Sequence, residues 1–588
     1  MQGAIKAVLD SAVAEFLRDF DCAGEGEASV VLNVPKDTAL GHFATPIAFS
    51  LAKQFKKSPK EIAELFAKKL QNLPQCSQNF SKIEAVNGYV NLTLSDNFLA
   101  EFSRKILESG FESAQKGLDS AKDNANELDS AKDSGAQNLK DFAGAQKEHI
   151  LLEFVSANPT GPLHIGHARG AIWGDTLARV GRFLGHKIEC EYYINDAGSQ
   201  IDNLVNSVLR AESSLDSANV GENLQNLNPA ESTQIPQDTQ NLDAQNLYKG
   251  EYVSELAREA KAHFGEDFCA PKNSAKLRDF CVGQMLSLIK SNLKSANIAF
   301  DSFVSERALM GGLDSAIARL KENNALYEND GKLWLKSSVF GDEKDRVIVR
   351  ENGEPTYLAG DIIYHNDKFS RPFTRYINIW GADHHGYIAR LRASVAFLGY
   401  DASKLEVLLS QMVSLLKDGE PYKMSKRAGN FILMSEIIDE IGIDALRFIF
   451  LTKRADTHLE FDIADLNAQD SSNPIFYINY ANARIHTLLG KSGAEISFDF
   501  SALDSAWKDL LFYALLLPSV LEGAFRERAM QKLPEYLKNL ASKLHFCYNS
   551  FKIIGSENEG EICAILRVVS RSITTGLALM GICAKTKM

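Results

Sequence analysis

Residues 149–185 read HILLEFVSANPTGPLHIGHARGAIWGDTLARVGRFLG and decide the fold class. An apolar strand over 149–158 is followed by a turn rich in proline and glycine and then by a long helix, predicted from about 164 to 184. A second strand is predicted from Lys187 to Asn195. Strand, turn, helix and strand in this order indicate a βαβ unit of a doubly wound parallel sheet, so we expect an α/β fold.

Two polar segments interrupt the chain. Residues 111–148 and 212–247 are rich in Ser, Asn, Gln, Asp and Ala and poor in aromatic and β-branched residues. Segments of this composition bury too little apolar surface to offset the entropy that is lost on ordering. We therefore predict that both are disordered insertions.

The rest of the sequence divides into three domains, because 588 residues are too many for one hydrophobic core. Residues 1–110 mix helical and strand-like patterns and predict an α+β N-terminal domain. Residues 149–445 are expected to form the α/β domain, with a helical insertion over about 248–340. Residues 446–588 carry Phe, Leu and Tyr at helical spacing and predict an all-α helix bundle. Within these domains we expect helices at 4–20 and 43–71, and strands at 88–94, 346–350, 375–380 and 405–413.

The net charge of the chain is −12, from 64 basic and 76 acidic side chains. Taken alone, an acidic chain argues against a polyanionic partner such as nucleic acid. Nine of the twelve net negative charges lie in the two insertions, however, and residues 523–552 of the predicted bundle carry a net charge of +4. Because the local field steers binding, the total charge does not exclude nucleic acid.

Composition excludes two other classes of protein. No apolar run approaches the roughly 18–20 residues of a membrane-spanning helix, so no membrane association is expected. The eight cysteines are scattered without a C-x-x-C pair, which argues against a disulfide framework and against a structural zinc site. A reducing cytoplasm is the expected compartment.

The first motif that carries chemistry lies at the carboxyl end of the first strand, where a doubly wound sheet binds its ligand. His164 and His167 begin the predicted helix and share one of its faces. The free N–H groups of a helix amino terminus favour phosphate, and Gly166 leaves room for a flat base or a ribose near the backbone. The alternative is a pair of helix-capping or core histidines.

The second motif is YKMSKRAGN at 422–430, between a predicted strand and a helix. Lys423 and Lys426 on such a loop can neutralise the charge that develops on a leaving pyrophosphate. The alternative is a solvated basic loop. The chain has no G-x-x-x-x-G-K-[ST] motif, which excludes a P-loop enzyme.

These two motifs resemble the paired HIGH and KMSKS signatures of class I aminoacyl-tRNA synthetases. The wider sequence is similar to that of the arginyl-tRNA synthetases over nearly the whole chain apart from the insertions. The resemblance extends to the segments 156–185, 192–198, 381–387, 444–447 and 473–484. It implies a class I Rossmann-type catalytic domain between an α+β N-terminal domain and a C-terminal helix bundle.

The resemblance implies a monomeric, cytoplasmic ligase that joins L-arginine to tRNA(Arg) in two steps. Arginine and ATP with Mg²⁺ would give arginyl-adenylate and pyrophosphate, and the terminal adenosine of tRNA would then take the arginyl group. Members of the family generally need bound tRNA for the first step, and we expect the same here. No zinc and no resident metal site are expected.

The resemblance also assigns residues to each part of the reaction. Catalysis is assigned to His164, His167, Lys423 and Lys426. ATP binding is assigned to Ala157, Pro159, Thr160, Gly161, Pro162, Leu163, Ile165, Gly166, Met424 and Ser425. Arginine binding is assigned to Glu153, Ser156, Asn158, Tyr357, Asp361 and Asp383. Binding of tRNA is assigned to Tyr477, Tyr480, Asn482 and Arg484.

The assigned residue types suit an arginine substrate. A planar guanidinium is best recognised by carboxylates and by an aromatic ring, and Glu153, Asp361 and Tyr357 match the family positions that hold it. Ser156 and Asn158 match positions near the α-amino and carboxylate end. The stretch Asp-His-His at 383–385 could contact arginine, the adenosine or nothing.

The two outer domains also resemble those of the family. Residues 1–110 are similar to a domain that touches the corner of tRNA, although His42 stands where an aspartate is common. The C-terminal bundle resembles an anticodon-binding domain, whose aromatic side chains could stack on splayed bases or could simply pack between helices.

Two alternative functions remain at this stage. A cysteinyl, glutamyl or methionyl synthetase would share the scaffold, but a thiol or thioether pocket would not favour Glu153 and Asp361. A non-catalytic tRNA-binding paralogue would carry damaged histidine or lysine motifs, and both are intact.

Overall fold

The structure is a computed structural model that describes residues 1–588 except 20–29, 111–146, 221–246, 423–430 and 471. The chain forms two compact units. The central unit consists of Glu148–Ala178 and His186–Asn467. The terminal unit consists of Met1–Lys147, Arg179–Gly185 and Ala468–Met588.

The central unit is built on a sheet of five parallel strands in the order β11-β10-β4-β5-β6. Its strands are β4 (His149–Glu153), β5 (Lys187–Ile194), β6 (Ser302–Ser305), β10 (Arg375–Gly381) and β11 (Leu405–Ser410). The order reverses between β4 and β10, so the crevice outside the carboxyl ends of these two strands is the expected ligand site. The predicted doubly wound α/β fold is therefore confirmed.

The sequence of β4 explains its central place in the sheet. Ile150, Leu151 and Leu152 are all at most 1% exposed, as expected for a strand covered on both faces. The helix α8 (Ile165–Phe183) follows and packs closely on the strand end. A Cβ atom on Gly174 would lie 2.5 Å from the ring of Phe154, so the close approach needs glycine at this position.

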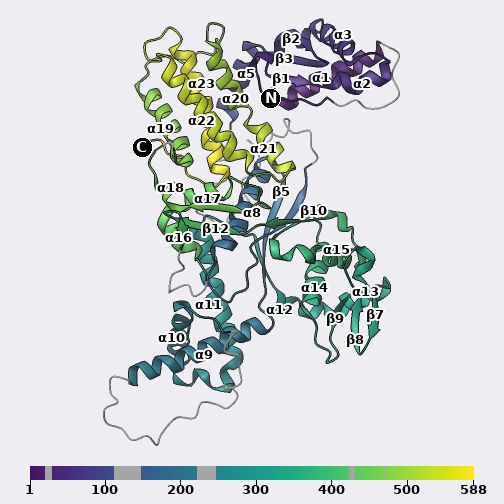
Figure 1. Cartoon of the computed structure of the whole chain (residues 1–588), viewed down its shortest axis with the longest axis vertical. Helices are drawn as coiled ribbons and strands as arrows, with labels where there is room; N and C mark the ends of the chain where they lie inside the picture. The colour runs from purple at the N-terminus through teal and green to yellow at the C-terminus, as the bar shows by residue number, and fades with distance from the viewer. Residues whose placement is uncertain (20–29, 111–146, 221–246, 423–430, 471) are drawn as a thin grey trace, which may run out of the picture. The chain divides into compact units, whose positions relative to one another are not determined.

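Two further helices support the crevice from the other half of the sheet. The helix α14 (Tyr357–Ser370) precedes β10, and α15 (Ile388–Phe397) follows it. Figure 1 shows α14 and α15 close together, beside the small antiparallel sheet of β7, β8 and β9. Leu358 and Ile362 of α14 belong to the apolar core that these elements share.

The predicted helical insertion is only partly correct. The helices α9 (Ser199–Val220), α10 (Glu251–Phe264) and α11 (Ser274–Ser295) pack around their own apolar core. The segment also contains the edge strand β6 and the hairpin of β7 (Leu326–Asn329) and β8 (Lys332–Leu335), which pairs with β9 (Arg346–Val349). The strands β6 and β7 have four residues each and no run of three apolar residues, so their pattern resembles that of exposed helical turns.

The polar insertion at 212–247 also begins differently from the prediction. The helix α9 continues to Val220 and includes the first residues of this segment. Residues 221–246 lie outside the described residues, as does nearly all of the segment 111–148.

The end of the central unit departs from the predicted boundary at 445/446, which falls within α17 (Ile443–Phe450). The unit continues to Asn467, and Arg447 of α17 is fully buried within it. Its guanidinium donates to Asp175 and, at 2.9 Å, to the carbonyl of Ala296.

The predicted strand at 405–413 is in fact two strands in different sheets. The first is β11, and the second, β12 (Val413–Lys417), pairs with β13 (Glu420–Pro421) and β14 (Leu459–Asp462). The short helices α16 (Met434–Ile441) and α18 (Ile463–Asn467) complete this region.

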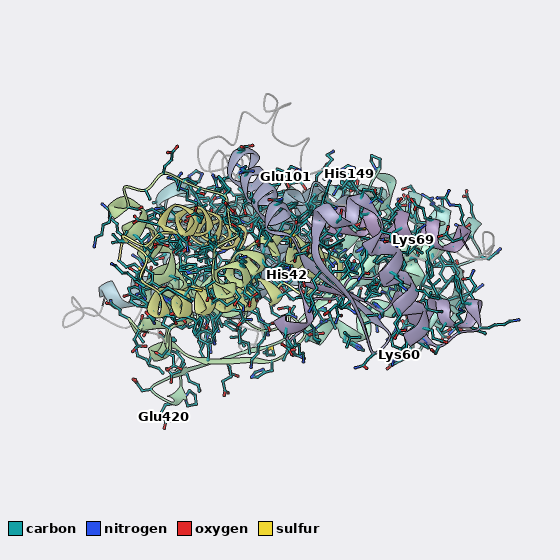
Figure 2. The ribbon with its side chains drawn as sticks, turned by 90° about the horizontal axis from the view of Figure 1, so that it is seen from above. His42, Lys60, Lys69, Glu101, His149 and Glu420 are labelled. Atoms are coloured by element: carbon teal, nitrogen blue, oxygen red, sulfur yellow. The ribbon has the colours of Figure 1, made fainter. Side chains whose placement is uncertain are left out.

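The terminal unit contains the predicted α+β N-terminal domain. Its antiparallel sheet has the order β1-β3-β2. The helix α3 begins with a capping box in which Ser58 and Glu61 bond each other's backbone N–H groups. Lys60 and Lys69, labelled in Figure 2, both come from α3. The elements are α1 (Gln2–Arg18), β1 (Phe43–Thr45), α2 (Ile47–Phe55), α3 (Pro59–Gln71), α4 (Pro74–Asn79), β2 (Phe80–Val86), β3 (Tyr89–Leu94) and α5 (Asp96–Ser109).

His42, which departs from the family pattern, has a packing role in this unit. Its Nδ1 accepts a hydrogen bond from the Leu94 backbone N–H at 2.9 Å. Its ring stacks on Phe512 with a centroid separation of 4.3 Å. Burial lowers the pKa of His42 to about 4, so the ring is neutral.

The C-terminal part of the terminal unit is the predicted helix bundle. Among the described residues, only α23 is long and apolar enough to cross a membrane, and 78% of its apolar window is buried inside the protein. A core helix of a bundle has the same composition. The bundle helices are α19 (Pro474–Lys491), α20 (Ser505–Leu515), α21 (Leu517–Arg526), α22 (Lys532–Ser550) and α23 (Glu559–Leu579).

Candidate active site

Two stacked imidazoles stand at the amino terminus of α8. His164 lies directly before the helix and His167 in its first turn, with ring centroids 3.6 Å apart. Nδ1 of His164 accepts from the Gly166 backbone N–H at 3.1 Å, and Nδ1 of His167 accepts from the His164 backbone N–H at 3.4 Å. Because Nδ1 is the acceptor in each ring, the ring proton lies on Nε2 and can be donated to a ligand.

Both rings are neutral at physiological pH. Burial lowers the pKa of His164, and burial together with the charge that a protonated His164 would carry lowers the pKa of His167 to about 3. The pair therefore offers hydrogen-bond donors to a phosphate without adding positive charge.

The chain that follows the lysine motif is bound to the histidine motif. His164 forms a β-bridge with Leu433, and the Ile165 backbone N–H donates to the carbonyl of Ile432 at 2.9 Å. The exposed ring of Phe431 stacks on the His164 ring at 5.1 Å. Lys423, Met424, Ser425 and Lys426 themselves lie outside the described residues.

A pocket of about 310 Å³ opens beside the histidine pair. Four of the predicted ATP residues line it, and Asn158, predicted for arginine, joins them. Pro159, Leu163 and Ile165 are buried, whereas Gly166 is exposed. The lining residues are Ala157, Asn158, Thr160, Gly161, Pro162, His164, His167, Leu247, Tyr248, Lys249, Tyr252, Phe431 and Leu433.

One wall of this pocket is formed by α10 and the residues before it. This wall was not predicted from the sequence. The Tyr252 hydroxyl donates to the carbonyl of Thr160 at 3.2 Å, and Tyr248 and Lys249 lie next to it. These residues directly follow the polar insertion, and no local motif marks them.

The backbone turns sharply where β4 ends. Val155 and Ser156 have φ angles of 68° and 42°, in the left-handed region that a β-branched valine rarely adopts. The turn brings the Ser156 hydroxyl back to Glu153, to whose Oε1 it donates at 2.9 Å. Such backbone strain is characteristic of functional sites.

Glu153 does not offer a free carboxylate to a guanidinium, which corrects the prediction for this residue. It is 4% exposed, and its Oε2 accepts from Nζ of Lys368 at 2.7 Å. Lys368 also donates to Asn378 at 2.7 Å. Because its second oxygen accepts from Ser156, Glu153 orients that hydroxyl, which in turn accepts from the Tyr193 backbone N–H at 3.1 Å.

Asp361, which is also predicted to bind arginine, lies in the second turn of α14. Burial raises its pKa to about 7, and the hydroxyl of Tyr387 donates to its Oδ2. Glu306 at the start of α12 (Glu306–Leu309) is a second acidic group near it, and burial raises the Glu306 pKa as well. Burial disfavours the charged form of both carboxyls, and a cation bound between them would stabilise that form.

Glu306 was not predicted from the sequence. It directly follows β6, and this four-residue edge strand had been assigned to a helical insertion. Recognising β6 would have placed Glu306 at the carboxyl end of a sheet strand, where ligands bind.

The other predicted arginine residues differ in their positions. Tyr357 starts α14 one turn before Asp361 and is 58% exposed, with its hydroxyl 3.4 Å from Ser199 Oγ. Asn158 donates to Gln200. Asp383 is not gathered with this group, because its side chain is 81% exposed and lies 3.6 Å from His384.

The predicted tRNA residues on α19 differ in how far their side chains are buried. Tyr480 is 42% exposed, and its ring stacks near His545 at 5.8 Å. Arg484 lies over the ring of Tyr548 at 3.6 Å. Tyr477 is half-buried and packs on His545 at 4.6 Å.

Asn482 is a packing residue, which corrects its assignment to RNA. It is fully buried, its Nδ2 donates to the carbonyl of Lys585 at 3.0 Å, and its Oδ1 accepts from Ser570 at 2.8 Å. The neighbouring α22 instead exposes Phe546, at 61%, which the sequence analysis did not select.

Within the described part of the chain, no group of three or more His, Cys, Asp or Glu side chains is arranged to hold a metal ion.

Comparison with known proteins agrees with this architecture. A family model described as tRNA synthetases class I (R), catalytic domain, matches residues 132–470. The arginyl tRNA synthetase N terminal domain matches residues 3–94, and the DALR anticodon binding domain matches residues 478–588.

Individual relatives match nearly the full length. The arginine–tRNA ligase of Campylobacter jejuni serotype O:6 is 50% identical over 96% of this chain and 97% of its own. That of Nitratiruptor sp. is 51% identical over 96% of this chain and 98% of its own. A crystal structure of a putative arginyl-tRNA synthetase from C. jejuni has a TM-score of 0.71 at 49% identity, covering 84% of this chain and all of that one. The Thermus thermophilus arginyl-tRNA synthetase shares the fold, with a TM-score of 0.70 at 20% identity over 99% of this chain and all of its own.

The parallel sheet, the histidine pair at its switch point and the matched catalytic domain define a class I aminoacyl-tRNA synthetase. Within that class, the chain belongs to the arginyl-tRNA synthetase family, which confirms the resemblance found in its sequence.

Proposed function

We propose that this chain attaches L-arginine to tRNA(Arg) in two steps, using the pocket beside His164 and His167 for ATP and the carboxyls of Asp361 and Glu306 for the arginine side chain. The observation that carries the proposal is that the pocket beside the histidine pair, Ser156 after β4 and Glu306 after β6 all lie at the carboxyl ends of parallel strands. There the nucleotide and the amino acid can meet.

In the first step the arginine carboxylate attacks the α-phosphorus of ATP in line, and pyrophosphate leaves. The Nε2–H groups of His164 and His167 donate to phosphate oxygens as negative charge shifts toward the leaving group. Lys423 and Lys426 are proposed to stabilise the pyrophosphate. ATP would enter with Mg²⁺ as part of the substrate, and the cation would neutralise phosphate charge.

Recognition of arginine assigns different ends of the substrate to different residues. Asp361 and Glu306 bind the guanidinium, with Tyr357 beside them. Ser156, oriented by Glu153, accepts from the α-ammonium group. Arginine differs so strongly from other amino acids in charge and shape that no editing site is needed.

In the second step the terminal adenosine of tRNA attacks the activated carbonyl. We propose that residues 1–110 contact the tRNA body and that the bundle, from residue 468 onward, reads the anticodon with Tyr480 and Arg484. Exposed aromatic and guanidinium groups of this kind stack on unpaired bases. A monomeric, cytoplasmic enzyme is proposed from the family resemblance.

The direct test is aminoacylation of tRNA(Arg) with labelled arginine, together with ATP–pyrophosphate exchange with and without tRNA. We expect charging with arginine and not with lysine or methionine, and exchange only when tRNA is present. Failure to charge any tRNA with arginine would refute the function. Equal exchange rates with and without tRNA would refute only the requirement for tRNA.

A further inference from the structure

Tyr387 occupies a position that the family assignment of substrate residues leaves unexplained. It is the last residue of the 3-10 helix Ala382–Tyr387 and caps the start of α15. Its ring packs against the apolar core that includes Leu358 and Ile362, on either side of Asp361 in α14. Its hydroxyl donates a hydrogen bond to Oδ2 of Asp361.

Charged side chains fix the position of the Tyr387 ring. The guanidinium of Arg390, one turn further along α15, lies over the ring at 4.8 Å. Nε of Arg390 is 3.6 Å from Oδ2 of Asp342, whose side chain is 2% exposed. Asp342 is itself fixed by Arg346 at 2.7 Å and by Ser337 at 3.0 Å. The hydroxyl that reaches Asp361 therefore comes from a ring with little freedom to move.

The charged groups around Asp361 make this hydrogen bond important. Glu306 on α12 and Glu153 on β4 both disfavour a negative charge on Asp361. The Tyr193 hydroxyl on β5 also lies close to Asp361. The charge of Lys368 on α14 favours the ionised form of Asp361, but its Nζ donates its hydrogen bonds to Glu153 and Asn378. Tyr387 supplies a hydrogen bond aimed directly at the carboxylate.

We propose that Tyr387 is a positioning residue for arginine recognition, whose hydroxyl keeps the Asp361 carboxylate ionised and oriented toward the substrate guanidinium. This inference rests on the proposed arginine pocket. A hydrogen bond to the charged form of a carboxyl favours that form. Without it, Asp361 remains protonated to a higher pH, and a neutral carboxyl binds a guanidinium only weakly.

The test compares Tyr387→Phe with Tyr400→Phe in the full-length chain. Tyr400 is a matched control because Arg319 lies over its ring at 4.2 Å and its hydroxyl contacts Asn366 at 3.1 Å, with no contact to Asp361. The measurements are the Kd of L-arginine by calorimetry and the KM values for arginine and ATP in aminoacylation, from pH 6.5 to 8.5. Circular dichroism verifies that each variant is folded.

For Tyr387→Phe we expect the Kd and KM of arginine to rise about tenfold or more at pH 6.5 and only about twofold at pH 8.5, because the higher pH restores the carboxylate. The KM of ATP should stay unchanged, and Tyr400→Phe should match the wild type at every pH. If Tyr387→Phe does not fold, Arg390→Lys should show a smaller loss with the same pH dependence.

Two results would overturn the inference: an unchanged affinity for arginine, or a loss that is equal at every pH. If the wild type itself does not bind or transfer arginine, the proposed function fails instead, so the two failures are distinguishable.

Discussion

Lys368 and Glu153 form an ion pair of 2.7 Å in which the two side chains are 0% and 5% exposed. The pair joins α14 to β4 beneath the catalytic crevice, and Ser156 and Asn378 complete its hydrogen bonds. Buried pairs of this kind contribute little net free energy but are costly to break, since the remaining charge is left without a partner.

Replacing Lys368 alone by methionine should therefore lower the free energy of unfolding of the central unit by about 3–5 kcal/mol. The double variant Lys368→Met/Glu153→Gln should recover part of this loss, because no charge is then left buried. Urea unfolding followed by tryptophan fluorescence measures both. If the double variant is as unstable as the sum of the two single variants, the pair is not coupled as the structure indicates.

Asp361 should make arginine binding depend on pH. Its folded-state pKa is about 7, above the value of 3.8 expected in the unfolded chain. If Asp361 binds the guanidinium as proposed, only its ionised form does so, and the Kd of arginine should rise as the pH falls below 7, by up to about tenfold for each pH unit. Calorimetry between pH 5.5 and 8.5 tests this, and a Kd that is constant over the range would contradict it.

The Asp361 carboxyl should lower the free energy of unfolding at the pH values at which it is ionised and can bind arginine. A raised folded-state pKa favours folding below pH 3.8, and this contribution is lost as the pH rises through about 7. Asp361→Asn should therefore raise the free energy of unfolding at pH 8, by at most about 4 kcal/mol, while it abolishes arginine binding. The gain should shrink as the pH falls toward 5, and thermal unfolding at both pH values measures the difference.

His167 should act without titrating in the working range. Because the pKa of His167 is about 3, the KM of ATP should show no titration of His167 between pH 5.5 and 8.5. His167→Ala should lower kcat by about 10²–10³-fold through loss of a donor to the transition state, with tRNA binding unchanged. His263→Ala, on α10, is the control and should retain full activity. Near-normal turnover by His167→Ala would refute the catalytic assignment.

Two neighbouring residues of α19 should give opposite phenotypes. Tyr480→Ala should raise the KM of tRNA about 5–100-fold through lost base stacking, with no change in stability. Asn482→Ala should destabilise the bundle by about 1–3 kcal/mol, because it removes the buried hydrogen bonds that Asn482 forms with Ser570 and with the Lys585 carbonyl. Filter binding of tRNA and thermal unfolding distinguish the two, and a loss of tRNA affinity in a stable Asn482→Ala would restore its assignment to RNA.

The sequence was sufficient for the features that depend on strong local patterns. The apolar run of β4, the turn rich in proline and glycine and the helix after it predicted the parallel sheet, and the histidine motif marked its switch point. It could not show β6, because a short edge strand has no apolar run, and Glu306 was missed with it. Nor could it show that Glu153 is already paired, since Lys368 lies 215 positions further along the chain. Tyr480 and Asn482 are two residues apart in the sequence, but the helix directs Tyr480 toward solvent and Asn482 into the bundle.

One helix bears residues at both ends of the proposed arginine pocket. Tyr357 and Asp361 stand at the start of α14, and Lys368, which fixes Glu153 and through it Ser156, stands seven residues beyond Asp361, about 10 Å along the axis. The rise of 1.5 Å per residue thus fixes the distance between these side chains along the helix axis. Inserting a single residue between Asp361 and Lys368 would rotate one side chain by about 100° relative to the other, so the spacing along α14 sets where the two proposed contacts with arginine lie.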